Sequence, residues 1–186
     1  MKTRIIKHFL LSCIICLQLL PLSAQDSKKS VKLGVAVNSD FNTELRTYSL
    51  SPTLIYLKNK SQYELGMGLN PLDLSQQRIL STELNHKFFP NGMENKYRLY
   101  FVSQLKYAKQ LRKNYFNSTY NYLFLNAGYG LNVNPSEKFY LSTDVKAGIF
   151  SFSNESENPF PAVKEQSLFE EIGFNLTFGF NLGYLF

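Results

Sequence analysis

The sequence predicts an all-β protein: an eight-stranded antiparallel up-and-down transmembrane β-barrel, preceded by a cleaved signal peptide. Three observations lead to this prediction. An apolar stretch follows cationic residues at the N-terminus, apolar and polar residues alternate through the rest of the chain, and long and short connections separate the alternating segments in turn. Hydrophobic residues make up 44% of the 186 residues and aromatic residues 15%. The mean hydropathy is nevertheless −0.20, which indicates alternation rather than long apolar runs.

The first 25 residues, "MKTRIIKHFLLSCIICLQLLPLSAQ", have the layout of a secretory signal peptide. Cations at positions 2, 4 and 7 precede an apolar run from Phe9 to about Leu20, and Ala24 stands at the expected cleavage point. The run is shorter than the roughly 20 residues that a membrane-spanning helix needs. We therefore predict a signal peptide over 1–24, a short N-terminal lead over 25–30 and a barrel domain over 31–186.

Two other interpretations of this segment remain, a single anchoring helix and a lipoprotein signal that ends at Cys13 or Cys16. The apolar run continues past both cysteines, which disfavours the lipoprotein signal. Cleavage after Ala24 removes both cysteines, so the mature chain has neither a disulfide nor a thiol nucleophile. It also removes three cations and lowers the formal charge from +6 to +3, so no nucleic-acid partner is expected.

The mature chain contains eight segments in which apolar and polar residues alternate with a period of two, the pattern of half-buried strands. The segments are 31–38, 47–57, 62–69, 79–89, 96–107, 120–133, 139–152 and 168–186. Four connections between them are long, and the other three, "KNKS", "PNGMEN" and "NPSE", are short and rich in turn residues. This alternation of lengths predicts an up-and-down meander in which all the long connections lie at one end. Pro52 removes a ladder hydrogen bond, which predicts a bulge or a local break in the second strand.

The last segment shows the division between the two faces most clearly. One face is entirely apolar or aromatic: Ile172, Phe174, Leu176, Phe178, Phe180, Leu182, Tyr184 and Phe186. The other face is small or polar at six of seven positions: Gly173, Asn175, Thr177, Gly179, Asn181 and Gly183. A slip of one residue would exchange these faces, so the strand register is strongly specified.

Charged residues fall in mid-strand on the polar face. They predict a structural network of ion pairs inside a narrow lumen, because buried charges require partners. The residues predicted for this network are Lys32, Glu64, Glu83, Lys87, Arg98, Lys106, Asp144 and Lys146. The same inventory would also suit the solvated outer face of a soluble barrel, so the charges alone do not decide which face points inward.

Aromatic residues favour the membrane barrel. With the apolar face outward, one group gathers near the short connections: Tyr56, Tyr63, Phe88, Tyr97, Phe139, Tyr184 and Phe186. Such a girdle is typical of a barrel at a lipid interface, and Tyr48 and Tyr107 are candidates for the second girdle. A sheet can span lipid only as a closed barrel. An even strand number then places both mature termini on one side, predicted to be the periplasm.

A signal peptide that ends in "SAQ", the hairpin "LSPTLIYLKNKSQYELGMGL" and the ending "LTFGFNLGYLF" together resemble one family. It is the small eight-stranded outer-membrane β-barrel family of Bacteroidota, similar in architecture to OmpX and to the OmpA membrane domain. The resemblance covers 30–186 and implies the outer membrane of a Gram-negative bacterium. It further implies contact with outer-membrane lipid and lipopolysaccharide, and with the insertion machinery during assembly. That machinery would read Phe186 and Tyr184 as an insertion signal.

Candidate catalytic residues are few. The resemblance extends to lipid A deacylases that use an outward-facing His–Ser pair, and His86 is the only histidine after cleavage. Its same-face neighbours, Leu84 and Phe88, are not serines, although a serine on a neighbouring strand would suffice. The spacing of Glu64, Glu83 and Asp144 does not indicate acid–base or metal chemistry. We therefore predict no catalytic residue, no cofactor and no metal.

Three functions are compatible with these predictions. The first is a non-enzymatic structural or interaction barrel with a side-chain-filled lumen and four surface loops. The basic, aromatic loop 108–119 and the acidic loop 153–166 are its candidate contacts with a surface partner. The second is a narrow channel or a conduit for small hydrophobic compounds, disfavoured because eight strands leave room only for side chains. The third is a lipid-modifying hydrolase, disfavoured by the missing serine.

Overall fold

The computed structural model describes residues 31–71, 77–113, 117–156 and 166–186. Its eight strands form a closed antiparallel barrel in which each strand pairs with its neighbours in sequence and β8 pairs with β1. The strands are β1 (Lys32–Asn42), β2 (Thr47–Lys58), β3 (Ser61–Leu69), β4 (Gln77–Phe88), β5 (Tyr97–Lys113), β6 (Asn117–Val133), β7 (Phe139–Ser156) and β8 (Ile172–Leu185). The predicted fold class is confirmed. The predicted signal peptide and N-terminal lead lie outside the described residues.

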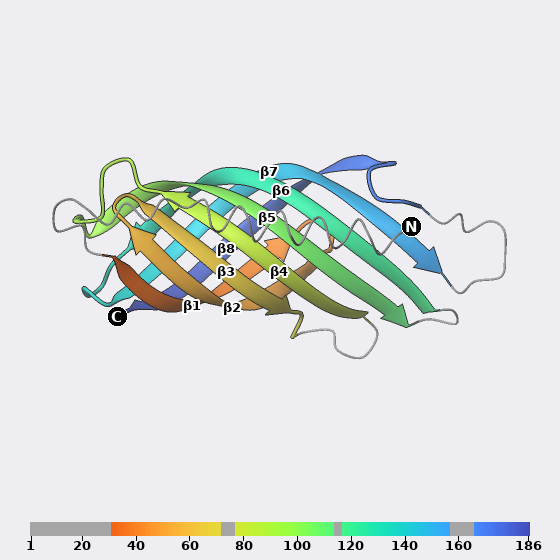
Figure 1. Cartoon of the computed structure of the whole chain (residues 1–186), viewed down its shortest axis with the longest axis horizontal. Coiled ribbons are helices and arrows are strands. Elements are labelled where there is room, and N and C mark those ends of the chain that lie inside the picture. Colours follow the sequence, from red (N-terminus) through yellow and green to blue (C-terminus); the bar gives the residue numbers. More distant parts are fainter. Residues whose placement is uncertain (1–30, 72–76, 114–116, 157–165) are drawn as a thin grey trace.

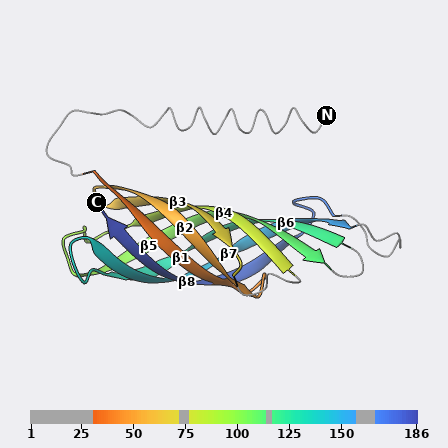
Figure 2. The ribbon, with the colours of Figure 1, turned by 90° about the horizontal axis from the view of Figure 1, so that it is seen from below.

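The strands run obliquely around the barrel, as Figure 1 shows. The start of β1 and the end of β8 lie together at the end of the barrel that carries the β2–β3, β4–β5 and β6–β7 connections (Figure 2). We call these the short connections and the other four the long connections, after the sequence prediction. The predicted contrast in length is wrong, because β1 extends beyond its predicted end and leaves only 43–46 before β2, whereas 89–96 separate β4 from β5. At the end with the short connections, the backbone N–H of Phe186 donates a hydrogen bond to the carbonyl of Leu33 at 2.8 Å. The last residue thus takes part in closing the barrel.

Burial alternates along each strand with the period expected of a half-buried sheet. In β8 the buried positions are the polar ones, such as Asn175, Thr177 and Asn181, and the exposed positions are the apolar ones, such as Phe174 and Phe180. The barrel is therefore apolar outside and polar inside. Within the described residues no helix is long and apolar enough to cross a membrane.

The region 108–119 was predicted to be a loop, and this prediction is wrong over most of its length. β5 continues to Lys113 and β6 begins at Asn117, and the two pair in an unbroken register from Tyr97↔Val133 to Lys113↔Asn117. Alternation continues here, but with Lys109 and Asn121 on the outer face instead of apolar residues. β7 likewise continues to Ser156, into the predicted loop 153–166, whose residues 157–165 lie outside the described residues.

Pro52 interrupts one ladder and leaves the other intact. β2 pairs with β1 continuously, and Pro52 faces Val37. On the β3 side the pairs Leu50↔Leu69 and Thr53↔Gly66 share one register, but Ser51 and Pro52 have no paired residue between them. The predicted local break is present without a bulge, because proline has no N–H to donate to the neighbouring strand.

Candidate functional site

The middle of the barrel holds a layer of buried charges, which we call the ionic layer. It contains four carboxylates and three ammonium groups, from β1, β3, β4, β5 and β7: Asp40, Glu64, Glu83, Asp144, Lys87, Lys106 and Lys146. All seven side chains are at most 3% exposed. Because these charges are removed from solvent, they are tolerated only where each has a counter-charge and hydrogen-bond partners.

Five ion pairs link the ionic layer across the lumen. The ammonium group of Lys87 lies 2.6 Å from Glu64. Lys106 lies 3.7 Å from both Asp40 and Glu83, and Lys146 lies 3.2 Å from Asp40 and 2.8 Å from Asp144. Three of these carboxylates are thus joined through two lysines, and the fourth forms a separate pair.

Amide side chains fill the space between the ion pairs. The amide N–H groups of Asn38 donate to Glu64 and to Glu83, both at 3.1 Å, and Gln62 donates to Glu64 at 2.6 Å. Gln104 accepts a hydrogen bond from Asn126 at 2.9 Å. The carboxylates are therefore engaged by fixed donors. No group of three His, Cys, Asp or Glu side chains suited to a metal ion occurs in the described part of the chain.

Six of the eight residues predicted for the lumen network belong to the ionic layer. The other two, Lys32 and Arg98, do not: they line an open hollow of about 570 Å³ at the mouth with the short connections. Lys32 is exposed, and Arg98 donates through Nε to the backbone carbonyl of Asn95 at 2.7 Å. They lie too near the ends of their strands to reach mid-lumen.

Asp40 is the member that the sequence prediction missed. The first segment was taken to end at Asn38, and the polar stretch after it was assigned to a long connection. β1 instead runs to Asn42, which places Asp40 on the same inner face as Ala36 and Asn38. Asp40 stands two residues after Asn38, so the alternation of faces along the strand would have identified it as inward-facing. The acidic residue is central to the ionic layer because both Lys106 and Lys146 contact it.

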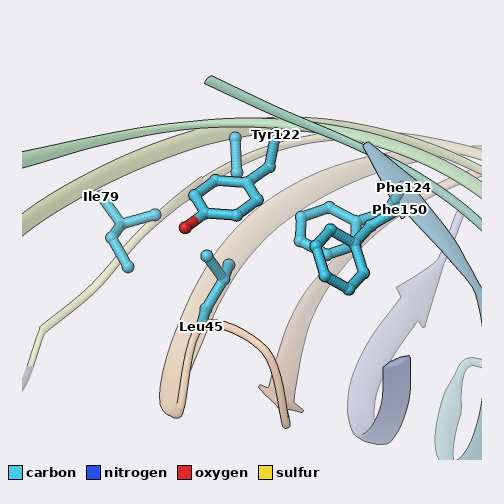
Figure 3. Close-up of a cluster of buried hydrophobic side chains, with 6 residues drawn as sticks. Leu45, Ile79, Tyr122, Phe124 and Phe150 are labelled. Carbon is cyan, nitrogen blue, oxygen red and sulfur yellow. The ribbon is translucent and has the colours of Figure 1, made fainter. Parts of the chain in front are cut away.

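Buried apolar side chains occupy the lumen on the side of the long connections. We call this cluster the upper plug; it consists of Leu45, Ile79, Ala108, Tyr122, Phe124 and Phe150. Leu45 comes from the turn between β1 and β2 and lies beneath the ring of Tyr122, close to Ile79 (Figure 3). Phe124 and Phe150 are 5.8 Å apart between ring centroids. An ion in contact with these apolar side chains would lose hydration that they do not replace.

A second apolar layer, the lower plug, occupies the lumen toward the short connections. It combines two buried clusters: Ala36, Ile55, Leu57, Tyr140 and Leu185, and Phe89, Tyr100 and Val102. Met93, from the connection between β4 and β5, packs against both clusters. The hydroxyl of Tyr100 donates to Asp144 at 3.0 Å and so joins this plug to the ionic layer. The lumen is thus an ionic layer between two apolar plugs.

The outer wall carries exposed large apolar side chains on every strand. The predicted girdle near the short connections lies on this wall, with Phe139 and Tyr184 in edge contact at 4.8 Å and Tyr184 and Phe186 at 5.5 Å. Phe186 is 71% exposed. An apolar wall of this extent is unsuited to water and suited to lipid.

His86 has a serine partner on a neighbouring strand, the alternative that the sequence prediction left open. Its Nε2 lies 3.3 Å from Oγ of Ser61, at the start of β3, and its ring stacks on Tyr63 at 4.8 Å. The strand pairing Tyr63↔His86 brings these residues together, which local spacing on β4 could not reveal. Among the described residues no carboxylate is hydrogen-bonded to His86, so the pair has no acidic residue to orient the ring as in a catalytic triad.

The sequence matches no protein-family model and no curated protein. Solved barrels do match the structure. One is the N-terminal β-barrel domain of Pseudomonas aeruginosa OprF, with a TM-score of 0.59, 14% identity and coverage of 86% of this chain and 100% of that one. Another is a major outer membrane protein from Thermus thermophilus, with a TM-score of 0.51, 12% identity and coverage of 84% and 100%. At these identities the likeness establishes the shared barrel fold.

Proposed function

We propose that this chain is an integral outer-membrane barrel whose sealed lumen conducts no solute and whose role is structural or interactive. The observation that carries the proposal is the ionic layer held between the upper and lower plugs, inside a wall that is apolar on its outer face. An eight-stranded barrel has an interior just wide enough for side chains, and here side chains fill it.

In this proposal the β2–β3, β4–β5 and β6–β7 connections and both mature termini face the periplasm. The connections β1–β2, β3–β4, β5–β6 and β7–β8 face outward as surface loops. The signal peptide, the girdle near the short connections and the resemblance to the Bacteroidota barrel family support this orientation. The insertion machinery would read Tyr184 and Phe186 during assembly. Outer-membrane lipid and lipopolysaccharide would surround the finished barrel.

Two measurements on one preparation test the proposal. The mature chain is folded into lipid vesicles, and a gel run with and without boiling checks that the barrel is closed. The same vesicles are then fused to a planar bilayer. We expect a folded band that shifts on boiling and no discrete conductance steps. Regular steps from preparations with the shifted band would refute the sealed lumen and favour the narrow channel.

The contact between His86 and Ser61 makes a lipid hydrolase the second candidate function, because the sequence prediction disfavoured it for lack of a serine partner. We propose that the pair is not catalytic, because no carboxylate in the described part of the chain orients the imidazole and the ring is stacked on Tyr63. The test is fatty-acid release from phospholipid and lipid A by the folded chain. Release that disappears in both His86→Ala and Ser61→Ala would establish the hydrolase instead.

A further inference from the structure

A row of polar side chains crosses the outer face near the ends of β5, β6 and β7 that carry the long connections. Lys109 pairs with Asn121, and Asn121 pairs with Ser153. The hydroxyl of Tyr107 donates to Oδ1 of Asn121 at 2.9 Å, and Nδ2 of Asn121 donates to Oγ of Ser153 at 3.2 Å. These hydrogen bonds fix the orientation of the Asn121 amide. The Lys109 side chain, next in the row, is exposed.

A second cation lies beside this row. Arg78 is on β4, two residues from Leu80, which pairs with Lys109. Both cations are exposed, and neither forms an ion pair with any described residue. Glu155 is on the same outer face, but on β7, two strands away from Lys109. Among the described residues, Arg78 and Lys109 therefore present two positive charges without a paired carboxylate on one patch.

An apolar groove lies directly below the polar row. It has a volume of about 170 Å³ and is lined on the outer face by Leu105, Leu123, Leu125, Ile149, Phe169 and Ile172. Phe169 has φ of 72°, an uncommon conformation for a bulky residue, and its backbone N–H donates to Oγ of Ser151 at 2.7 Å. The turn before β8 thus places an aromatic side chain that is 67% exposed over the barrel wall.

The polar row lies at the level along the barrel where lipid headgroups are expected. From the girdle residue Tyr97 to Tyr107, both on the outer face of β5, the strand advances ten residues. At about 3.3 Å per residue and a tilt of about 40°, this advance rises about 25 Å, the height of the apolar band of a membrane barrel. Lys109 stands one step beyond that band.

We infer that this patch is a binding seat for an anionic, phosphate-bearing lipid of the outer leaflet. Its phosphate lies between Lys109 and Arg78, and one acyl chain lies in the groove, which extends from Leu105 on β5 to Phe169. A free phosphate ion would use the cations but not the groove, whereas a lipid uses both. The inference deepens the proposed function, since it rests on the barrel being placed in the membrane with its long connections outward.

The test measures lipid retention by the purified, folded mature chain in detergent, with native mass spectrometry as the readout. The probes are phosphatidylglycerol, phosphatidylcholine with the same acyl chains, and inorganic phosphate. The test variant is Arg78→Gln/Lys109→Gln. The matched control is Lys58→Gln/Lys138→Gln, which removes the same charge at the opposite end of the barrel. Phe169→Asn removes the ring and keeps a residue that tolerates positive φ.

We expect the wild type to retain phosphatidylglycerol in preference to phosphatidylcholine. Each cation near a membrane surface changes the affinity for anionic lipid about fivefold, so the test variant should lose about 25-fold. The control should retain phosphatidylglycerol like the wild type, and Phe169→Asn should weaken retention of both lipids.

Equal retention of the two lipids by the wild type would overturn the inference. So would equal losses in the test and control variants, or inorganic phosphate that displaces phosphatidylglycerol at comparable concentration. The wild-type comparison of lipids does not depend on the folding of any variant. If the lipid-binding inference fails, the gel shift on boiling and the absence of conductance steps are unaffected. Its failure is therefore distinguishable from failure of the proposed function.

Discussion

The ion pair between Lys87 and Glu64 provides the sharpest test of the ionic layer. Its two charged atoms are 2.6 Å apart, and the side chains are 2% and 0% exposed. At this distance the attraction is about 6 kcal/mol for an effective dielectric constant of about 20. Lys87→Met removes the ammonium group and leaves the carboxylate of Glu64 buried without a counter-charge.

Removing one partner of a buried ion pair costs about 3–5 kcal/mol. Glu64 keeps amide donors from Gln62 and Asn38, so we expect the lower part of this range, about 3 kcal/mol. In the double variant Glu64→Gln/Lys87→Met neither charge remains. Its loss in the free energy of unfolding should be smaller than the summed losses of the single variants by about 2 kcal/mol.

The assay is urea unfolding in lipid vesicles, with the folded fraction read from the migration shift on unboiled gels. The sequence has no tryptophan to report unfolding by fluorescence. Lys138→Met, at an exposed lysine on the short connection before β7, is the matched control and should unfold like the wild type. A loss below about 1 kcal/mol for Lys87→Met, or additive losses in the cycle, would refute the view that this pair is a coupled unit.

Two further outcomes are expected. A Cβ on Gly128 would collide with the backbone carbonyl of Val145 on β7, so Gly128→Ala should lower the free energy of unfolding by about 1–3 kcal/mol in the same urea assay, and an unchanged midpoint would refute this close approach. Phe186→Ala should reduce the amount of folded barrel in cells but lower the free energy of unfolding of the purified protein by no more than about 1 kcal/mol. The control is Phe139→Ala, which removes another ring of the girdle. Equal effects of the two variants in cells would argue against a terminal insertion signal.

The number of strands and the division of each strand into two faces were predictable because they depend on local pattern. In β8 the alternation of Phe, Leu and Tyr with Gly, Asn and Thr assigns each residue to a face without knowledge of any neighbour. Strand ends were less predictable. Where β5 and β6 leave the apolar band their outer face turns polar, so Lys109 and Asn121 carry no apolar signal although the strand pairing continues.

Most members of the ionic layer could be predicted from the alternation of inward and outward positions along each strand. Which residues form ion pairs with one another could not. Asp40 was missed because its strand was ended too early, and Arg98 was included although it sits near the mouth. His86 illustrates the same limit: its serine partner lies on β3, 25 residues away in sequence. The upper plug also depends on Leu45, a turn residue whose burial no strand pattern indicates.

The sequence by itself determined the repeating unit of this protein, a strand with one apolar and one polar face, because side-chain direction follows from the backbone pleat within a few residues. It also determined that eight such units join as an up-and-down meander. Only the tertiary structure decided which lysine meets which carboxylate, that apolar plugs enclose the ionic layer, and that cations stand above a groove on the outer wall. Those relations depend on the stagger between strands around a closed barrel, which is set by pairing across the whole sheet.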